Sequence, residues 1–312
     1  FVEYTNKRWF DSYHSDQMRK YEQYAGNLTS LQVIQDYIAV KILKEERKIP
    51  DHAVFVPGHS GDMLAGSWIP FEIKNMPFTI DSCINHLLQR HYSLWRWNNN
   101  KNETIDSLFR ERIRKAIGNI AIDNAESFAN TIEYFNFNER QAKFIVNSVR
   151  VYEFFGYEWR IPLWDAELID FFLQVPLPMR FNQFLYKKYI FDKIFKREFE
   201  ELSKITCTTV IKGRLKSSKV NTIKNIIFKR FPLIRDLLQD VFQYYKIMTE
   251  YSSNPMNLYS IMSKKEIKKN YPKIQNINAF LTKQYLMTIY ANYSLSSNYW
   301  LSAILCNCKD LT

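Results

Sequence analysis

Glycine is scarce in this chain of 312 residues, and it is unevenly distributed. There are only seven glycines, and Gly58, Gly61 and Gly66 fall close together. Long apolar runs are missing too. No stretch of ~18 uninterrupted apolar residues occurs, which argues against a membrane-spanning helix. The start of the sequence shows no pattern typical of a secretory signal. Glycine is thus concentrated in one segment, and that segment is the first place to look for function.

Cysteine and histidine are sparse and carry no metal-binding pattern. The four cysteines form no C-x-x-C pair, and the five histidines have no H-x-x-x-H spacing. This excludes a disulfide framework and a paired zinc site, and Cys306-Asn307-Cys308 alone is a weak metal signal. We therefore expect free thiols in a cytoplasmic protein. The histidines are expected to be hydrogen-bonded side chains.

Acidic residues are outnumbered by basic ones. Lys and Arg total 43, Asp and Glu total 32, and the net charge is +11, which favours anionic partners. Residues 204–235 hold nine basic residues and no acidic one. This segment is either a solvated lysine-rich surface or a surface that faces phosphate. Hydrophobic residues make up 46% of the chain, enough for a packed core and against wholesale disorder.

The glycine-rich segment follows a short apolar run. Residues 53–56 are apolar and partly β-branched, and Pro57-Gly58 stops them, which predicts a fully buried strand. The turn that follows contains Asp62. Glycines after a strand allow backbone amides to approach an anion, and a carboxylate among them can hold a divalent metal. Two structural alternatives exist: the glycines supply positive φ in a tight turn, or Asp62 caps the following helix.

A second segment, Tyr157 to Asp165, helps to interpret the glycine-rich segment. Together the two resemble the synthetase domain of the asparagine synthase family. There a strand ends in Ser-Gly-acidic-Gly-small-Asp-Glu-Leu-Phe-Gly-Gly, and a later Glu-x-Arg-x-Pro-Phe-Leu-Asp opens a helix. The matching residues are Gly58, Asp62, Leu64, Gly66, Glu158, Arg160, Pro162 and Asp165. The resemblance covers roughly residues 1 to 230. His59, Met63 and Ala65 depart from it. The sequence Pro-Gly-His-Ser-Gly-Asp resembles that of family members found in surface-polysaccharide (LPS/O-antigen) gene sets.

The resemblance implies cofactors and site residues. ATP and Mg²⁺ are expected, with Asp62 as the metal ligand. Backbone amides of Gly58, Ser60 and Gly61 would contact the nucleotide or its acyl adenylate. Glu158 would take part in acid–base catalysis, while Arg160 is better explained as the partner of a structural Glu–Arg pair. Farther along the chain, the resemblance points to Lys212 and Lys216 as candidates for contact with the leaving pyrophosphate, and to Arg214 for cofactor binding.

The resemblance also implies an activity and a missing part. The family binds ATP through a Ser-Gly-Gly-x-Asp-Ser loop, which does not occur here, so we interpret the chain as N-terminally truncated. It carries no N-terminal nucleophilic cysteine, so ammonia would come from a separate glutaminase subunit or domain. The implied function is an ATP-dependent, AMP-forming amidoligase acting on a small-molecule acyl acceptor, an amino acid or a sugar precursor. The alternative is an inactive family member that binds an anionic partner through residues 204–235. Nucleic acid is not the expected partner.

The expected fold is α/β. It is a partial parallel sheet of the adenine-nucleotide alpha-hydrolase (PP-loop ATPase) type, followed by a mostly helical region. Strands are predicted at 2–4 and 53–56. Helices are predicted at 16–25, 31–49 with Thr29 or Ser30 as cap, from Asn138 onward, 166–174 with Asp165 as cap, 183–203, 221–247 and 276–292. The predicted domain limits are 1–78, 79–235 and 236–312.

Overall fold

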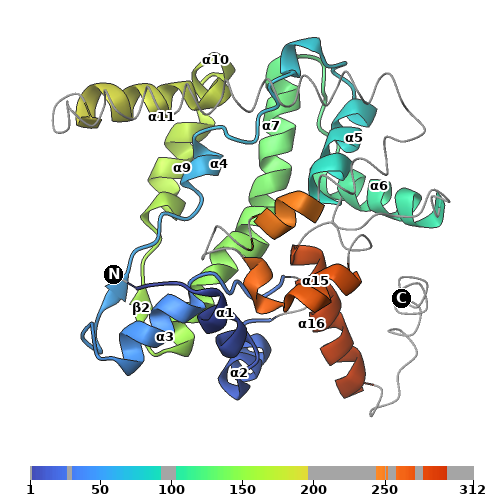
Figure 1. Ribbon diagram of the computed structural model, residues 1–312. Helices are drawn as coiled ribbons and strands as arrows, with labels where there is room; N and C mark the ends of the chain where they lie inside the picture. Colours follow the sequence, from blue (N-terminus) through green and yellow to red (C-terminus); the bar gives the residue numbers. More distant parts are fainter. Residues whose placement is uncertain are drawn as a thin grey trace.

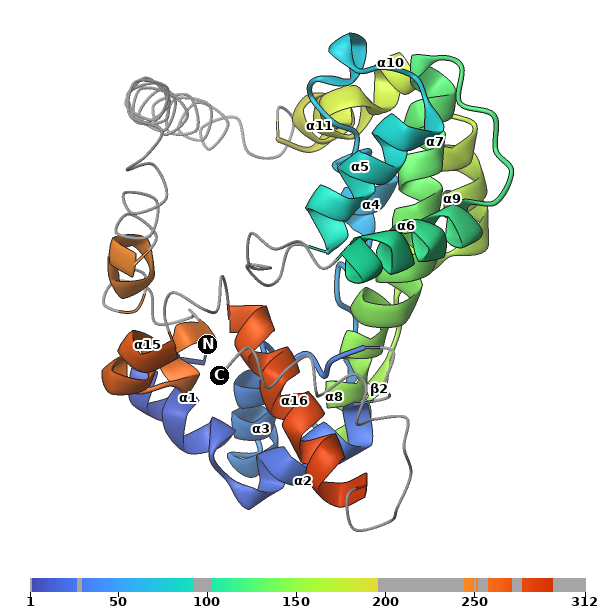
Figure 2. The ribbon, with the colours of Figure 1, turned by 90° about the vertical axis from the view of Figure 1, so that its right-hand side faces the viewer.

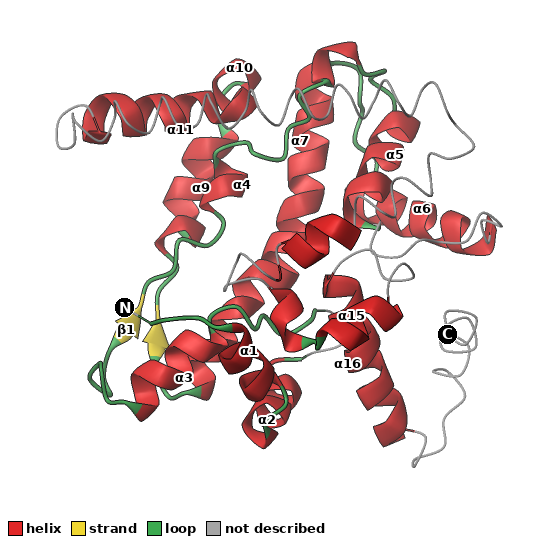
Figure 3. Cartoon of the chain, viewed as in Figure 1, coloured by secondary structure: helices red, strands yellow, loops and turns green. Residues whose placement is uncertain are grey.

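The computed structural model describes residues 2–26, 30–92, 103–195, 244–249, 251, 258–270 and 277–293. These residues are mostly helical, with one small parallel sheet (Figure 3). Figures 1 and 2 show two groups of helices, an upper and a lower one. A long helical segment, residues 125–154, runs from one group to the other. The α/β expectation therefore holds only in that a two-stranded parallel sheet is present, and the PP-loop ATPase fold stays a prediction.

The lower group is built from both ends of the described chain. It contains α1 (Asn6–Tyr13), α2 (Asp16–Ala25), α3 (Tyr37–Glu45), η7 (Leu258–Ile261), α15 (Lys264–Asn270) and α16 (Ile277–Tyr293). Their apolar faces share one core with residues 149–157. The helix predicted at 16–25 is confirmed, and the one predicted at 276–292 is confirmed to within one residue. The helix predicted from 31 is wrong at its start, because Asp36 and not Ser30 precedes the first turn.

The sheet consists of β1 (Val54–Phe55) and β2 (Glu158–Trp159), paired in parallel with Val54 opposite Glu158. The prediction of a fully buried strand is wrong: Val54 is 45% and Val56 61% exposed. Among the described residues β1 pairs with β2 alone, which leaves Val54 and Val56 exposed. Phe55 is the residue that faces the lower core, where its ring stacks on Tyr152 at 4.4 Å.

Residues 2–4 form no strand, contrary to prediction. Tyr4 of this segment packs through its side chain and takes part in no β-sheet. The Tyr4 ring lies 5.5 Å from that of Trp9, and its hydroxyl donates to the Gln35 carbonyl at 3.0 Å.

The long helical segment changes its winding along its length. It comprises α7 (Ala125–Phe135), the π-helix η2 (Asn136–Ile145), the 3₁₀ turn η3 (Val146–Val149) and α8 (Arg150–Phe154). The predicted helix start at Asn138 is wrong, because the helix begins after Asn124, which forms a capping box with Ser127. Asn138 instead donates to the Tyr134 carbonyl one turn back. π-helical turns are rare and are often found at functional sites.

The upper group has its own core. It contains α4 (Gly61–Leu64), η1 (Ile73–Asn75), α5 (Ile80–His91), α6 (Glu103–Ile117), η4 (Pro162–Trp164), α9 (Ala166–Leu173), α10 (Leu177–Arg180), η5 (Phe181–Gln183), α11 (Phe184–Tyr189) and η6 (Ile190–Phe195). Cys83, Leu87, Ile113 and Phe128 are fully buried in this core. The Asp165 cap is confirmed, since its carboxylate accepts from the amides of Glu167 and Leu168. The helices predicted at 183–203 and 221–247 are described only at 184–195 and 244–249.

Candidate functional site

The two motifs lie side by side. β1 leads into the glycine turn (Gly58–Gly66) and β2 leads into Pro162 and Asp165, so both segments run in the same direction. The Arg160 amide donates to the Phe55 carbonyl at 2.9 Å, which continues the pairing beyond the strands. Farther along, Gly61 lies against Leu163: a Cβ at Gly61 would stand 2.6 Å from Leu163 Cδ1. Two segments about a hundred residues apart thus form one structural unit.

A buried chain of polar side chains anchors the glycine turn. Ser60 has a left-handed backbone (φ 69°) and precedes α4. Its hydroxyl donates to Gln141 Oε1 at 3.0 Å, and Gln141 Nε2 donates to Asn136 Oδ1 at 3.0 Å. All three residues are buried. The Ser60 hydroxyl therefore serves the fold, and only its backbone amide is left for a ligand.

Gly66 and Gly58 of the turn differ in backbone conformation and in the space around them. Gly66 has φ 89°, and a Cβ there would stand 2.4 Å from the Arg180 carbonyl oxygen, so no other residue fits. Gly58 meets nothing within 4 Å and its φ is not positive. The alternative that glycine supplies positive φ in a tight turn thus applies to Gly66. No neighbouring atom obstructs the backbone of Gly58.

His59 is held on the long helical segment and is not a solvent-facing turn residue. Its Nε2 lies 3.0 Å from Ser148 Oγ, and that hydroxyl donates to the Ile145 carbonyl at 2.6 Å. Since the Ser148 proton is used there, the histidine Nε2–H is the donor between them. Burial lowers the pKa of His59, against the opposing pull of Asp36, so the ring is neutral near pH 7.

Asp62 is exposed in the first turn of α4, and its carboxylate accepts from the Ser67 hydroxyl at 3.3 Å. The residue that caps this helix is Ser60, so the capping alternative for Asp62 is wrong. The described part of the chain holds no group of three or more His, Cys, Asp or Glu side chains arranged for a metal. A lone carboxylate still fits magnesium, because Mg²⁺ takes most of its ligands from phosphates and water.

The side chain of Glu158 is engaged within its own segment. Its carboxylate pairs with Arg160 at 3.1 Å, the Glu–Arg pair that the sequence suggested, and both side chains are exposed. Glu158 lies opposite Val54, at the start of the two parallel segments, whereas Asp62 follows at their far end. Its acid–base role stays a prediction. Lys212, Arg214 and Lys216 lie outside the described residues.

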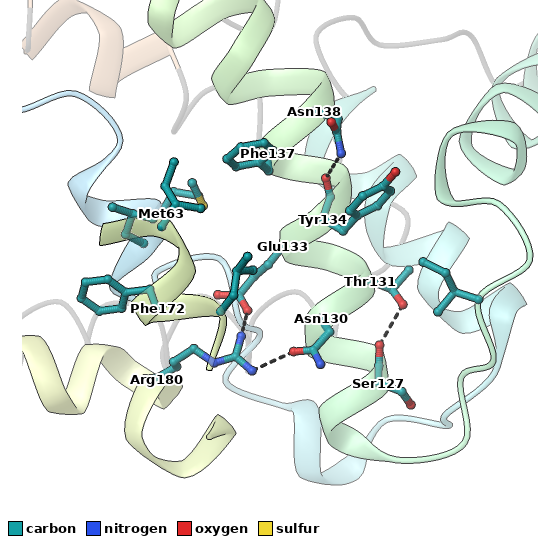
Figure 4. Close-up of a pocket in the computed structure, with 14 residues that line it drawn as sticks. Met63, Ser127, Asn130, Thr131, Glu133, Tyr134, Phe137, Asn138, Phe172 and Arg180 are labelled. Carbon is teal, nitrogen blue, oxygen red and sulfur yellow. Dashed lines mark hydrogen bonds and ion pairs between the residues drawn. The ribbon is translucent and has the colours of Figure 1, made fainter. Parts of the chain in front are cut away.

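A cavity of about 540 Å³ lies beside the glycine turn and is bounded by α4, α7, α9 and α10 (Figure 4). Most of its wall is apolar, with a few polar groups at one side. The lining residues are Met63, Leu64, Ile120, Ser127, Asn130, Thr131, Glu133, Tyr134, Phe137, Asn138, Ile169, Phe172, Leu173 and Arg180. The two residues that follow Asp62 thus form part of this wall.

The polar side of the cavity is organised by Arg180, whose side chain is 7% exposed. One terminal nitrogen pairs with Glu133 and the other donates to Asn130 Oδ1 at 2.7 Å, as Figure 4 shows. Nε donates to the Val175 carbonyl at 2.7 Å. Burial raises the pKa of Glu133 to about 7 although Arg180 opposes the rise. The cavity therefore combines an apolar body with a buried ion pair.

Residues 55–201 match the family model for asparagine synthase. The match begins in β1 and includes both motifs, and it covers a little under half of the chain. It supports membership of the asparagine synthase family and a ligase-type function that depends on ATP, which this family generally uses. No curated protein and no solved structure matches the chain. Within the described residues, no helix has the length and apolar character needed to cross a bilayer.

Several residues within the matched segment could not be predicted as site residues from the sequence. Glu126, Asn130 and Glu133 recur at helical spacing on α7, so their polar stripe on an otherwise apolar helix was a usable signal. Gln141 and Arg140 gave no signal of their own. They become important only because η2 passes beside the glycine turn, a contact that spans about eighty residues of sequence.

Proposed function

We propose that this chain is the synthetase part of an ATP-dependent, AMP-forming amidoligase. The supporting observation is that the match over residues 55–201 coincides with the parallel segments carrying both motifs. In the proposed reaction a substrate carboxylate oxygen attacks the α-phosphorus of ATP, and the bond to pyrophosphate breaks. Ammonia then attacks the acyl carbon, AMP leaves with the electron pair of the acyl–oxygen bond, and the nitrogen loses a proton.

The proposed roles follow from the motif residues. Asp62 would hold magnesium, which would neutralise negative charge on the phosphates and the leaving group. The amides of Gly58 and Gly61 would face the adenylate. Lys212 or Lys216 would stabilise the charge that develops on pyrophosphate. The sequence assigns Arg214 to the nucleotide, and this too is part of the proposal.

The cavity beside α4 is our candidate for the acyl substrate. Its volume falls in the range of small-molecule sites, and its wall includes Met63 and Leu64, next to Asp62. The family has a carboxylate where this chain has His59, a neutral ring tied to Ser148. We infer a substrate without the ammonium group of aspartate, such as a sugar acid of a surface-glycan precursor, with ammonia supplied by a separate glutaminase.

The test is AMP and pyrophosphate release by this protein with Mg·ATP, ammonium and candidate acids. Asp62→Asn is expected to lower the rate by about 10²–10³, the usual effect of removing one positioned charge in such a site. Asp16→Asn is the matched control, because Asp16 is an exposed carboxylate on α2 in the lower group. Full activity in Asp62→Asn contradicts the magnesium role.

A second candidate is a binding protein that retains the fold without the chemistry. The exposure of Glu158 and its pairing with Arg160 favour it. The same assay separates the two. Turnover that requires Asp62 supports the ligase, whereas Mg·ATP binding with no AMP formed from any acceptor supports the binding protein.

A further inference from the structure

A second group of side chains, here called the basic cluster, surrounds Trp68, which follows the glycine turn by two residues. It comprises Trp68, Arg90 and His91 at the end of α5, and Arg140 in η2. The guanidinium carbons of Arg90 and Arg140 lie 4.8 and 4.7 Å from the Trp68 ring centroid. The His91 ring stacks on Trp68 at 5.2 Å, with 16° between the planes. One aromatic ring thus fixes two cations close together.

The cations of this cluster are not neutralised within the described residues. Neither guanidinium has a hydrogen-bond acceptor or a carboxylate at ion-pair distance there, whereas Arg180 and Arg110 have both. Nε2 of His91 is buried without a partner, as is Nε2 of neighbouring His86. Two guanidinium groups held together without an anion form an arrangement that charge repulsion disfavours unless a ligand completes it.

Asp62 acts electrostatically on Arg140 of the cluster. Burial lowers the pKa of Arg140, Arg90 lowers it further, and Asp62 opposes both. Burial, together with Arg140, Arg90 and His86, lowers the pKa of His91 to about 4, so this ring is neutral near pH 7. The cluster therefore presents two positive charges beside the one carboxylate proposed as a magnesium ligand.

We propose that Arg90 and Arg140 bind an oligophosphate, pyrophosphate or the phosphate chain of a nucleotide, beside Asp62. Guanidinium forks match phosphate oxygens in pairs, and stacking on Trp68 fixes their planes in advance. Two cations call for a ligand with at least two negative charges. The Asp62 carboxylate would repel a bare anion, so the ligand enters as its magnesium complex. The identity of this ligand rests on the proposed function, but the site itself rests on the cluster.

These residues are additional to the cations expected from the sequence. Lys212 and Lys216 come from a segment outside the described residues, whereas Arg90 belongs to α5 of the upper group and Arg140 to η2 of the long helical segment. Their distance in the sequence and the absence of a shared motif explain why only the structure brings them together.

The test is calorimetric titration of the full-length protein with magnesium pyrophosphate, orthophosphate and Mg·ATP. Arg90→Gln and Arg140→Gln are each expected to weaken pyrophosphate binding at least tenfold, and Arg140→Lys less than Arg140→Gln. Arg114→Gln is the control, because Arg114 is an exposed arginine on α6 with a long contact to Asp81. Orthophosphate should bind far more weakly. Arg90 is exposed, so its variant tests the proposal even if Arg140→Gln fails to fold.

The outcomes separate this proposal from the proposed function. Unchanged pyrophosphate binding in Arg90→Gln and in Arg140→Lys or Arg140→Gln overturns the site, even if the protein forms AMP. Orthophosphate binding as tight as that of pyrophosphate overturns the choice of an oligophosphate. Pyrophosphate binding that depends on both arginines, in a protein that forms no AMP, supports the site and rejects the ligase.

Discussion

Gly66 and Gly58 belong to the same turn but differ in what the fold demands of them. Gly66 has positive φ and touches the Arg180 backbone, whereas Gly58 has open space around it. We expect Gly66→Ala to lower the free energy of unfolding by about 2–5 kcal/mol, through backbone strain and the clash together. Gly58→Ala should change it by less than about 1 kcal/mol. Urea titration of both variants measures this, and equal losses would contradict the assignment.

Glu133 makes stability depend on pH. Its pKa in the folded protein is raised to about 7 from 4.5, so between these values the folded state keeps a proton that the unfolded state has lost. The free energy of unfolding therefore falls as pH rises from about 4.5 to about 7, by up to about 3 kcal/mol, and this contribution is constant above. The measurement is thermal or urea unfolding at several pH values between 4.5 and 8.

Glu133→Gln is the variant for this measurement, because glutamine can still accept a hydrogen bond from Arg180 but does not titrate. The decline between pH 4.5 and 7 should be smaller in this variant than in the wild type. Glu111→Gln, an exposed residue on α6, should leave the decline unchanged. Identical pH profiles for wild type and Glu133→Gln would show that Glu133 ionises normally in the folded protein.

At the scale of elements, the π-helix η2 connects the glycine turn to the long helical segment. Ser60 and Gln141 form the direct bond, and Asn136 supports Gln141 from the same element. We expect Ser60→Ala and Gln141→Ala each to cost about 1–3 kcal/mol, since each leaves a buried polar partner unsatisfied. The double variant should cost less than the sum of the two. A double-mutant cycle by urea unfolding tests this, and strict additivity would mean that the bond contributes nothing.

The elements that could be predicted from sequence are those whose signal is local. The cap of α9 by Asp165 and the helix at 16–25 follow from a few adjacent residues, and both are confirmed. The predicted start at Asn138 is wrong because a local capping pattern lies within a helix that already began at Ala125. Burial of residues 53–56 was overestimated because the number of neighbouring strands cannot be seen in the strand itself.

The candidate site divides in the same way. Its motif residues could be recognised in the sequence. The Glu158–Arg160 pair joins residues only two positions apart. Arg180 with Glu133 and Arg90 with Arg140 are pairs that tertiary packing creates, between residues about fifty apart in the sequence. No local pattern encodes such contacts. A sequence can thus indicate that the glycine turn has a function, but not which cations or cavity surround it.

At the scale of the whole molecule, the described residues form two hydrophobic cores, and one helical segment contributes side chains to both. The lower core contains Trp9, Tyr21 and Ile38, and the upper core contains Leu87 and Phe128, with no buried residue in common. Residues 125–154 supply side chains to both, the first half to the upper core and the second half to the lower. The glycine turn and most of the basic cluster belong to the upper group, and Arg140 lies on the long helical segment. Their geometry therefore depends chiefly on the upper core.

This arrangement predicts that the two groups lose stability separately. Leu87→Ala removes a fully buried side chain from the upper core, at a cost of about 2–5 kcal/mol. Amide exchange should become faster in α5, α6 and α7, while α2 and α3 remain protected, because their contacts lie in the other core. Ile38→Ala, the matched change in the lower core, should do the reverse. Hydrogen exchange followed by mass spectrometry measures both, and equal acceleration throughout either variant would mean that the long helical segment couples the cores into one cooperative unit.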